Sequence, residues 1–537
     1  MKPGRWRKIR LSIALSVFIL FLFASFSSSP PALIISRILS RIQLAPAILR
    51  ASGIPEALTG AAEKVHPAVQ ISAVSGAAAA LIILLSAYLF GRVYCSLICP
   101  IGLFQDVFID TRRKMPAGRF RFLKPFNSVR FGILLLCTGA AFAGIMMPLI
   151  LLEPYSIWGR FTLDIAHPLS VLAGRAVFTA LRPFGIFINL IRYNFNLPVF
   201  AVTFLTALTL IFFTLKKGRV YCSLVCPAGT LLGLFSRKSL RRVAIDPLLC
   251  TSCGLCEKKC RTGCIDSKGK TVDSGRCVMC GDCLTGCPAD AIKYSKKAPA
   301  KSVKNRQPYN RSRRTFLGTL KKFSGASLSA LIIPSWLIPR TRIRGLTPEG
   351  EANTPSTPPG SKGINHFSSL CIACHRCVSV CPTNVLQPSL FEYGIKGILQ
   401  PVMDYRSGFC EFECTLCTHT CPTGAIIPLT AEVKKSIQIG RVYFEKDKCV
   451  VVTGGTICGA CAEGCPTHAV GMEPYKNGLD IPVTDNSLCV GCGSCEYICP
   501  VPEKAIYVKG LEVHGKAEVR EPLYRTPKDT SDEGFPF

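Results

Sequence analysis

Cysteine is the residue type whose number and spacing dominate this sequence. Of the 30 cysteines in 537 residues, most fall into six groups of four with spacing close to C-x2-C-x2-C-x3-C, and five of the six groups end in Cys-Pro. Thiolate sulfur is a soft ligand that suits iron, and this spacing is the ligand pattern of [4Fe–4S] clusters, each of which takes four cysteines. The pattern predicts single-electron chemistry at six clusters. The groups are Cys250, Cys253, Cys256 and Cys260; Cys277, Cys280, Cys283 and Cys287; Cys371, Cys374, Cys377 and Cys381; Cys410, Cys414, Cys417 and Cys421; Cys449, Cys458, Cys461 and Cys465; Cys489, Cys492, Cys495 and Cys499.

Consecutive groups are expected to exchange their fourth ligand, as in two-cluster proteins of this pattern. Cys287 then joins the first triplet and Cys260 the second, and the same exchange applies to the later pairs. The first group departs from the pattern because Arg261 follows Cys260, and Cys264 four residues on could compete as the ligand. The spacing favours Cys260.

Two groups have insertions in front, before Cys414 and before Cys458. We expect each insertion to lengthen a loop without moving the remaining three ligands. A zinc ribbon would need paired C-x2-C knuckles, and it explains neither the third cysteine nor the proline. Cys371 to His375 also matches the C-x-x-C-H motif of haem attachment. A covalent haem would leave the remaining two cysteines of that group without a role as ligands.

A second cysteine pattern, C-x3-C-P, occurs twice within a repeated segment. Residues 91–100 read GRVYCSLICP and residues 218–227 read GRVYCSLVCP, so the copies differ at a single position. Each copy follows an apolar segment, which predicts two duplicated helical hairpins. The four repeat cysteines could supply one further metal centre, form a thiol/disulfide couple, or be structural; they are Cys95, Cys99, Cys222 and Cys226.

The apolar segments that precede and separate these motifs predict a membrane domain. Mean hydropathy is +0.33, and four segments have about the 20 apolar residues that cross a bilayer. They are residues 11–26, 69–90, 131–152 and 197–215. Residues 33–49 and 165–191 contain arginines and are expected at the interface instead. The net charge of +31 is typical of cytoplasmic loops and headgroup contacts, and no basic patch interleaved with aromatics indicates nucleic-acid binding.

The remaining chain divides into soluble domains and a linker. We expect an α-helical membrane domain with four spans over residues 1–245, then an α+β domain for two clusters over 246–295. Residues 296–363 are a basic linker in which Arg313-Arg314-Thr315-Phe316-Leu317 resembles a twin-arginine export signal, followed by a fifth, signal-anchor-like span. Residues 364–515 are expected to form a four-cluster α+β domain, and residues 516–537 a tail.

Polar residues at the outer ends of the spans are candidates for a quinone site. Oxidation of a quinol needs an acceptor for its protons, and a carboxylate or a histidine can serve. Glu153 and His167 are the two candidates, against the simpler interpretation of a solvated outer loop. No nucleophile–base pair, phosphate loop or open metal site indicates a self-contained enzyme.

The first half of the chain resembles NapH-type membrane quinol dehydrogenase components, which have four spans, two C-x3-C-P motifs and a two-cluster domain. Residues 310–510 resemble exported four-cluster ferredoxins of the NapG and MauM type, so the chain resembles a fusion of the two. The membrane proteins of the NosR type share the first half. The resemblance implies a bacterial inner-membrane protein that passes electrons from quinol through [4Fe–4S] clusters to a periplasmic reductase. It places residues 246–295 in the cytoplasm and residues 364–537 in the periplasm. The alternatives are a redox-sensing or maturation factor, and electron transfer from a cytoplasmic ferredoxin to quinone.

Overall fold

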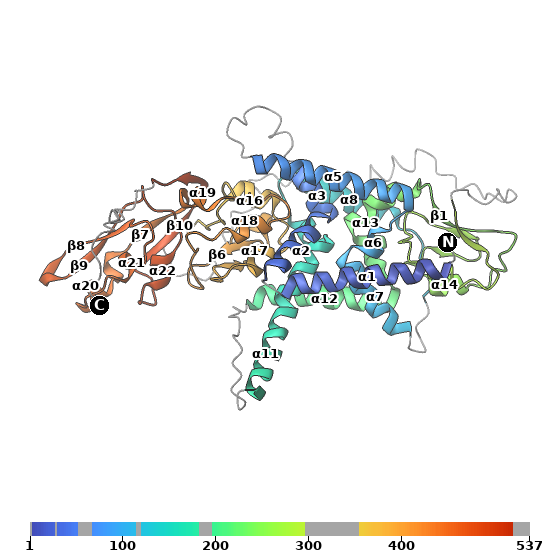
Figure 1. The fold of residues 1–537 in the computed structure, drawn as a ribbon, viewed down its shortest axis with the longest axis horizontal. Coiled ribbons are helices and arrows are strands. Elements are labelled where there is room, and N and C mark those ends of the chain that lie inside the picture. Colours follow the sequence, from blue (N-terminus) through green and yellow to red (C-terminus); the bar gives the residue numbers. More distant parts are fainter. Residues whose placement is uncertain are drawn as a thin grey trace, which may run out of the picture.

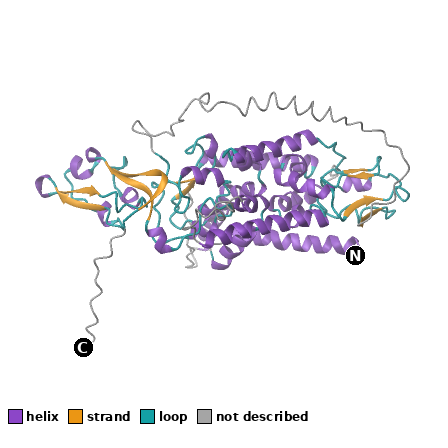
Figure 2. Cartoon of the chain, turned by 90° about the horizontal axis from the view of Figure 1, so that it is seen from above, coloured by secondary structure: helices purple, strands orange, loops and turns teal. Residues whose placement is uncertain are grey.

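Three parts follow one another along the long axis of the molecule (Figure 1). The computed structural model describes residues 3–26, 29–51, 67–113, 120–181, 196–295 and 354–518. Helices form the middle part, whereas the strands lie in the two end parts (Figure 2). The predicted twin-arginine segment, the fifth span and most of the tail lie outside the described residues.

The middle part is a helical bundle built from the first 237 residues. Pro198 in the first turn of α12 and the Asn196 side chain, which accepts a hydrogen bond from the Val199 N–H, begin this helix, and Gly218 at φ 72° ends it. The elements are α1 (Pro3–Phe26), α2 (Pro30–Arg41), α3 (Leu44–Ala51), α5 (Pro67–Phe90), α6 (Tyr94–Leu97), α7 (Pro100–Arg113), α8 (Asn127–Phe142), α9 (Met147–Leu152), α10 (Pro154–Arg160), η1 (Phe161–Ala166), α11 (His167–Leu181), α12 (Leu197–Lys217), η3 (Tyr221–Val225) and α13 (Pro227–Arg237).

Two helices in the described residues are long and apolar enough to cross a membrane, Arg5–Phe26 of α1 and Leu197–Lys217 of α12. The segment predicted as an interfacial helix over 33–49 forms α2 and α3, a pair bent by 77° that counts as a third span only if the two helices act together. Helix α5 covers the predicted span 69–90.

The predicted span over 131–152 is interrupted in the structure. Helix α8 ends at Phe142, and α9 begins at Met147 with Pro148 in its first turn. Between them Gly144 adopts φ +72°, a left-handed conformation that an α-helix cannot continue through. The predicted interfacial segment 165–191 begins as η1 and α11, and α11 runs across the direction of α1 and α12 (Figure 1).

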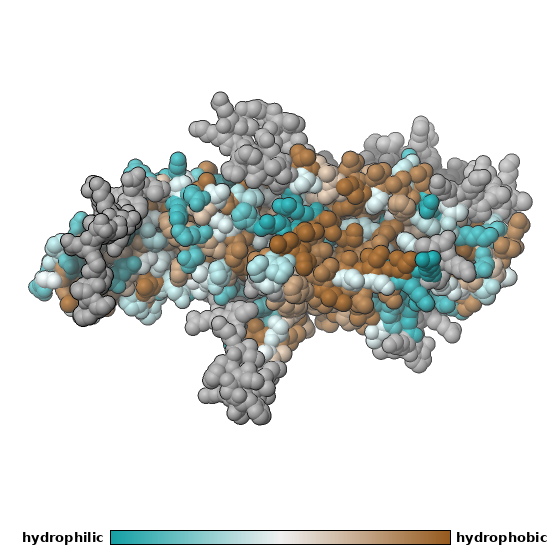
Figure 3. All heavy atoms as spheres, in the orientation of Figure 1, coloured by the Kyte–Doolittle hydropathy of each residue, from teal (hydrophilic) through white to brown (hydrophobic). Residues whose placement is uncertain are grey.

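On the face of the molecule shown in Figure 3, most of the surface of the helical bundle is apolar. Leu81 of α5, Leu135 of α8 and Leu205 of α12 are each exposed by 64% or more. Soluble monomers rarely expose a continuous apolar surface of this kind, whereas a bilayer covers it. The hydrophilic surface lies towards the two end parts.

The end part that follows α13 has two nested strand pairs. Strand β1 pairs antiparallel with β4 in the register Arg242↔Ser295 to Ile245↔Ile292, and β2 pairs with β3 between them in the sequence. The eight cysteines of the first two groups lie between the outer strands. The elements are β1 (Arg242–Ile245), α14 (Leu255–Lys259), β2 (Ile265–Asp266), β3 (Thr271–Val272) and β4 (Ile292–Ser295).

The opposite end part holds the last four cysteine groups and repeats the nested pairing. Strand β7 pairs with β10, and β8 pairs with β9 between them, while β5 and β6 form a separate short pair. The elements are α16 (Ile364–Leu370), α17 (Arg376–Ser379), β5 (Leu386–Pro388), η4 (Ile395–Gly397), β6 (Pro401–Met403), α18 (Leu416–Thr420), α19 (Ala431–Lys435), β7 (Ile437–Phe444), η5 (Lys446–Lys448), α20 (Val450–Gly454), α21 (Ala460–Glu463), β8 (Val470–Pro474), η6 (Lys476–Gly478), β9 (Asp480–Thr484), α22 (Ser494–Ile498) and β10 (Ile506–Lys516).

Candidate metal centres and the interfaces that connect them

In the third and fourth cysteine groups, the last cysteine of each group lies among the thiols of the other group. Burial raises the pKa of the Cys377 thiol well above its ordinary value, and the neighbouring Cys371, Cys374 and Cys421 thiols raise it further. Burial likewise raises the pKa of Cys417, with Cys410, Cys381 and Cys414 as further causes. Thiols that raise one another's pKa lie close together, so each triplet has the fourth cysteine of the other group beside it.

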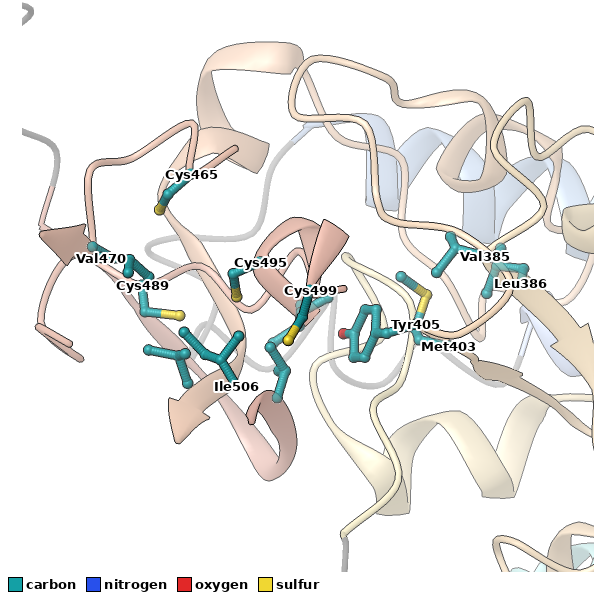
Figure 4. Close-up of a cluster of buried hydrophobic side chains, with 14 of the residues drawn as sticks. Val385, Leu386, Met403, Tyr405, Cys465, Val470, Cys489, Cys495, Cys499 and Ile506 are labelled. Atoms are coloured by element: carbon teal, nitrogen blue, oxygen red, sulfur yellow. The ribbon is translucent and has the colours of Figure 1, made fainter. Parts of the chain in front are cut away.

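The fifth and sixth groups show the same exchange. Burial raises the pKa of Cys495, and Cys492, Cys489 and Cys465 raise it further. Figure 4 shows Cys465, Cys489, Cys495 and Cys499 among the buried side chains of this part. Cys499 instead lines a small pocket whose other cysteines are Cys449, Cys458 and Cys461.

In the two-cluster end part, the described residues show one triplet of cysteines together with the fourth cysteine of the other group. A pocket is lined by Cys277, Cys280 and Cys283 together with Cys260. The Cys260 Sγ lies 3.7 Å from the Thr262 hydroxyl. The same 3.7 Å contact to a threonine two residues on is made by the fourth cysteines of three other groups, Cys381, Cys421 and Cys465. Cys260 therefore has the local geometry of a fourth ligand.

Cys264 lies in the same pocket, with its sulfur 3.5 Å from the Cys260 Sγ. It is 2% exposed. Its position makes it a fifth thiol beside a complete set of four, rather than a replacement for Cys260.

The backbone around the second cysteine has the same conformation in four of the six groups. The residue before and the residue after that cysteine both have positive φ; the pairs are Ser252 and Gly254, Met279 and Gly281, Ala373 and His375, Gly491 and Gly493. Alternating left-handed residues turn successive N–H groups towards one concave side, which binds anions such as iron–sulfur clusters. The two groups with insertions lack this pattern, so the insertions change the loop conformation as well as its length.

The chemistry of the donor set favours clusters over single ions. All 30 cysteines are free thiols, and in the described part of the chain no three His, Cys, Asp or Glu side chains are close enough to hold one metal ion. A cubane binds each thiolate at a different iron, so its four cysteines surround a space instead of meeting at a point.

The cysteines of the repeated segment are buried in the bundle, each 4% exposed. Cys95 lies in α6, Cys99 precedes α7, Cys222 lies in η3 and Cys226 precedes α13. The side chain of Cys99 has those of the other three as electrostatic neighbours. The structure therefore brings the two C-x3-C pairs together.

The four-cluster part contacts the bundle next to its first cluster loop. The Ser156 hydroxyl donates a hydrogen bond of 2.5 Å to the Ile372 carbonyl. A Cβ at Gly159 would overlap the Cys374 carbonyl oxygen. Arg376 donates to the Ala24 carbonyl at 2.9 Å and to the Ser36 hydroxyl. The bundle thus lies against the loop that carries Cys374.

The two-cluster part contacts the bundle through charges. Asp106 of α7 is buried and forms ion pairs with Arg10 at 3.0 Å, Arg219 at 2.6 Å and Arg261 at 2.9 Å. Arg10 also donates to the Cys280 carbonyl at 3.2 Å. Arginines from three separate segments thus form ion pairs with the Asp106 carboxylate, next to the loop that carries Cys280.

The predicted quinone residues lie at the starts of α10 and α11, on either side of η1, and Glu153 lies near the four-cluster part. Glu153 caps α10, accepts a 2.5 Å hydrogen bond from the Ser156 N–H and is 1% exposed. Burial raises the pKa of its carboxyl to about 7. His167 begins α11, and half-burial lowers the pKa of its imidazole.

A small pocket lies between α7, α10, η1 and α12. Its lining includes Phe104, Phe161 and Arg160. Arg160 is 1% exposed, and its Nη1 has no hydrogen-bond partner among the described residues. Trp158 packs against both phenylalanines with ring centroids 6.3 and 5.9 Å away. The pocket therefore combines aromatic walls with one unsatisfied cationic donor.

Sequence reasoning missed the arginines that hold these parts together. Arg92 and Arg219 are the second residue of each repeat copy, so the repeat itself pointed to them. His375 has its Nδ1 3.7 Å from the Asp164 carboxylate of η1. That contact between distant segments has no sequence signal beyond the C-x-x-C-H motif, which we had set aside.

Family models describe most of the cysteine-bearing segments. A 4Fe-4S binding domain matches residues 72–118 and 199–245, another matches 247–263, and a 4Fe-4S dicluster domain matches 370–425 and 456–502. The methylamine utilization ferredoxin-type protein MauM of Methylobacillus flagellatus is 32% identical over 186 residues, which is 32% of this chain and 78% of MauM.

The chain belongs to the MauM family of ferredoxin-type proteins. Two Escherichia coli proteins are also similar to this MauM-type chain. The ferredoxin-type protein NapF is 28% identical over 29% of the chain and 86% of its own length, and NapG is 28% identical over 29% and 71%. The MauM-type chain is thus an iron–sulfur electron-transfer protein that binds 4Fe–4S clusters, and it carries apolar helices that could span a membrane.

Proposed function

We propose that this protein is a membrane-bound electron relay that takes electrons from quinol and delivers them through [4Fe–4S] clusters to a periplasmic acceptor or reductase. The observation that carries the proposal is one continuous buried cluster of side chains running through the helical bundle. It contains Cys280 at one end, Trp158 in between and Cys374 at the other end. The bundle therefore connects a cluster loop of each end part.

The six cysteine groups are the proposed ligands of six clusters. The exchanged grouping in five sets, the inward-turned N–H groups in four loops and the free thiols support [4Fe–4S] clusters there. When bound, each cluster accepts and gives up one electron at a time. The protein binds the clusters in a row and excludes water from them.

The orientation follows from the charges at the two ends of the apolar surface. The basic residues at the start of α1 lie at the two-cluster end, where Arg7 pairs with Asp282 at 3.3 Å. Basic residues accumulate on the cytoplasmic side of inner-membrane proteins. We therefore place residues 246–295 in the cytoplasm and residues 364–537 in the periplasm of a bacterial inner membrane.

The quinol site is proposed at the small pocket lined by Phe104, Phe161 and Arg160, which has to widen to admit the ring because its volume of about 10 Å³ is what one water molecule needs. Aromatic side chains suit a flat quinol ring, and the free Nη1 of Arg160 can donate a hydrogen bond to a ring oxygen. Oxidation of a quinol to the quinone releases two electrons and two protons. Glu153, on the same helix as Arg160, accepts a proton and remains buried next to the loop of Cys374.

The test is reduction of the anaerobically purified full-length protein by a quinol analogue, followed by optical bleaching and EPR. We expect fast reduction in the parent protein. Reduction in Glu153→Gln should be about 100-fold slower, because general bases contribute about 10²–10⁴-fold. Glutamine can still accept the Ser156 hydrogen bond, so the helix cap is kept. His167→Ala tests the second candidate in the same way.

The pH dependence separates proton acceptance from structure. A carboxyl accepts a proton only when ionised, so with a pKa of about 7 the parent rate should rise as the pH increases through 7. Glu153→Gln should lack this rise. Unchanged rates in both variants, or reduction only by a cytoplasmic ferredoxin, would overturn the quinol assignment.

A further inference from the structure

We propose that Arg37, Arg41 and Arg50 bind the phosphate group of an anionic phospholipid where the helical bundle meets the four-cluster part. The three arginines belong to α2 and α3, the pair of helices bent by 77°. Helix α2 contacts α18 of the four-cluster part and lies at the end of the bundle that faces it (Figure 1). The site is separate from the cluster ligands and from the pocket proposed for quinol.

One face of α2 combines apolar and basic side chains. Ile34, Arg37, Ile38 and Arg41 follow the i, i+3, i+4, i+7 spacing that places residues on one side of a helix. Ile34 and Ile38 are 57% and 56% exposed, whereas Ser36 is buried on the opposite side. Exposed isoleucines beside guanidinium groups suit the boundary between acyl chains and lipid headgroups.

Arg50 contributes a buried donor that the protein does not use. The residue is 6% exposed, and its Nη2 donates to the Pro422 carbonyl, whereas its Nη1 has no hydrogen-bond partner among the described residues. Its stem is held against α5, because a Cβ at Gly76 would lie 2.9 Å from the Arg50 Cβ. The charge of Arg41 acts on Arg50, and that of Arg37 acts on Arg41. Three like charges thus lie within electrostatic reach of one another.

No carboxylate compensates these charges from the helices that pack around them. Helix α2 packs against α1, α3 and α18, and α3 packs against α5. None of these five helices contains an aspartate or a glutamate. A buried charge without a partner is strongly unfavourable. A phosphate supplies the missing negative charge, and its oxygens match the paired N–H groups of a guanidinium.

The iron–sulfur cluster of Cys421 is the other candidate for the missing negative charge. Cys421 acts on Arg50, which donates to the carbonyl of the next residue. Arg41, in contrast, is influenced by its burial and by Arg37, with no thiol among the causes. The cluster can therefore balance Arg50 but leaves the two arginines of α2 without a counter-charge.

The position of the arginines favours a lipid phosphate over a free one. In the orientation proposed above, this end of the bundle faces the periplasm, where basic residues beside membrane spans are disfavoured. A headgroup in the outer leaflet gives these arginines a role. Ile34 and Ile38 lie on the same face of α2 as Arg37 and Arg41 and contact the acyl chains of the same lipid.

The first experiment measures lipid binding to the parent protein. The full-length protein is purified anaerobically, delipidated in detergent and titrated with phosphatidylglycerol or phosphatidylcholine, and bound lipid is counted by native mass spectrometry. We expect saturable retention of phosphatidylglycerol, no retention of phosphatidylcholine, and no displacement by an equal concentration of inorganic phosphate. Equal retention of the two lipids, or displacement by inorganic phosphate, would overturn the proposal.

The second experiment removes the two charges of α2 and leaves Arg50 in place. In Arg37→Gln/Arg41→Gln, the affinity for phosphatidylglycerol should fall at least about 10-fold, since one hydrogen bond to a charged group contributes about tenfold or more. Arg37→Lys/Arg41→Lys keeps the charges and should restore part of the affinity. Lys216→Gln/Lys217→Gln, which removes two charges from the last turn of α12, is the matched control and should bind as the parent does. Equal losses in the two glutamine variants would contradict a specific site.

Iron content and EPR midpoints of the same samples distinguish lipid binding from a role at the cluster. We expect both to equal those of the parent in Arg37→Gln/Arg41→Gln. A lowered midpoint with unchanged lipid affinity would assign the arginines to the cluster of Cys421 and overturn the proposal. If this variant loses iron, the titration of the parent protein still decides. Neither experiment uses quinol, so failure of the quinol proposal and failure of this one are distinguishable.

Discussion

The two ends of the helical bundle hold their cluster domains by different physical means. At the two-cluster end, the contact is a network of charges around Asp106 and Asp282, with arginines from α1, α7, the repeat and the domain itself. At the four-cluster end, side chains of the bundle donate to backbone carbonyls, as Ser156 does to Ile372 and Asn196 to Pro388. The close approach at Gly159 completes that surface.

The difference matches the position of each domain in the chain. The two-cluster domain follows α13 directly, so charges need only fix its orientation. The four-cluster domain is joined to the two-cluster domain through residues 296–353, and it contacts the bundle by shape and backbone hydrogen bonds. Loss of charge at Asp106 or Asp282 should therefore affect the two-cluster end most, whereas added volume at Gly159 should affect the four-cluster end.

The largest effect is expected for Asp106→Asn. Asparagine keeps the shape but leaves Arg10, Arg219 and Arg261 without their shared carboxylate. Removal of one partner of a buried ion pair costs about 3–5 kcal/mol. Thermal unfolding of the detergent-solubilised protein should show this loss. Asp110→Asn, whose side chain is 47% exposed, should cost about 1 kcal/mol or less. Equal losses of unfolding free energy in the two variants would contradict the conclusion that Asp106 is the main charged contact of this interface.

A smaller loss is expected for Asp282→Asn. Burial alone would raise the pKa of Asp282, but its ion pairs with Arg261 and Arg113 outweigh burial and lower the pKa to about 2. Relative to an unfolded pKa of about 3.9, this corresponds to about 2–3 kcal/mol of stability. The contribution is complete above pH 4 and is lost as the pH falls through 2. The difference in unfolding free energy between parent and variant should therefore be constant from pH 5 to 8. A difference that changes within this range would contradict the assignment.

The smallest of the three effects is expected for Gly159→Ala, and it should be confined to the four-cluster end. The added methyl group overlaps the Cys374 carbonyl, and overpacking of this kind costs about 1–3 kcal/mol. Limited proteolysis should release the four-cluster domain faster, with thermal unfolding of the two-cluster end unchanged. Gly132→Ala on α8 is the control, because nothing lies within 4 Å of its Cβ position. Equal proteolysis rates in the two variants would contradict a close-packed interface.

The sequence was most informative where spacing dictates chemistry. The cysteine spacing predicted iron–sulfur binding, and the family match supports 4Fe–4S clusters. The exchange of fourth ligands could be predicted because it follows from a local pattern repeated along the chain. The count of spans could not be predicted equally well, since hydropathy does not register a single left-handed glycine such as Gly144.

The contacts at the two interfaces could not be predicted from the sequence. Asp106 is an ordinary acidic residue in a basic chain until the fold brings three arginines to it. Arg160 lies between two of the segments that hydropathy defined, and no motif distinguished it in the sequence. Long-range contacts of this kind depend on which helix packs against which, and no local pattern reports that choice.

The hydrogen bonds of Arg92, in the first repeat copy, have a consequence for biosynthesis. Arg92 reaches its acceptor only when Cys222 has been made, 130 residues later in the chain. The second acceptor of Arg92, the Gly275 carbonyl, is made later still. The hydrogen bonds of this buried arginine therefore form only after both repeat copies have been synthesised.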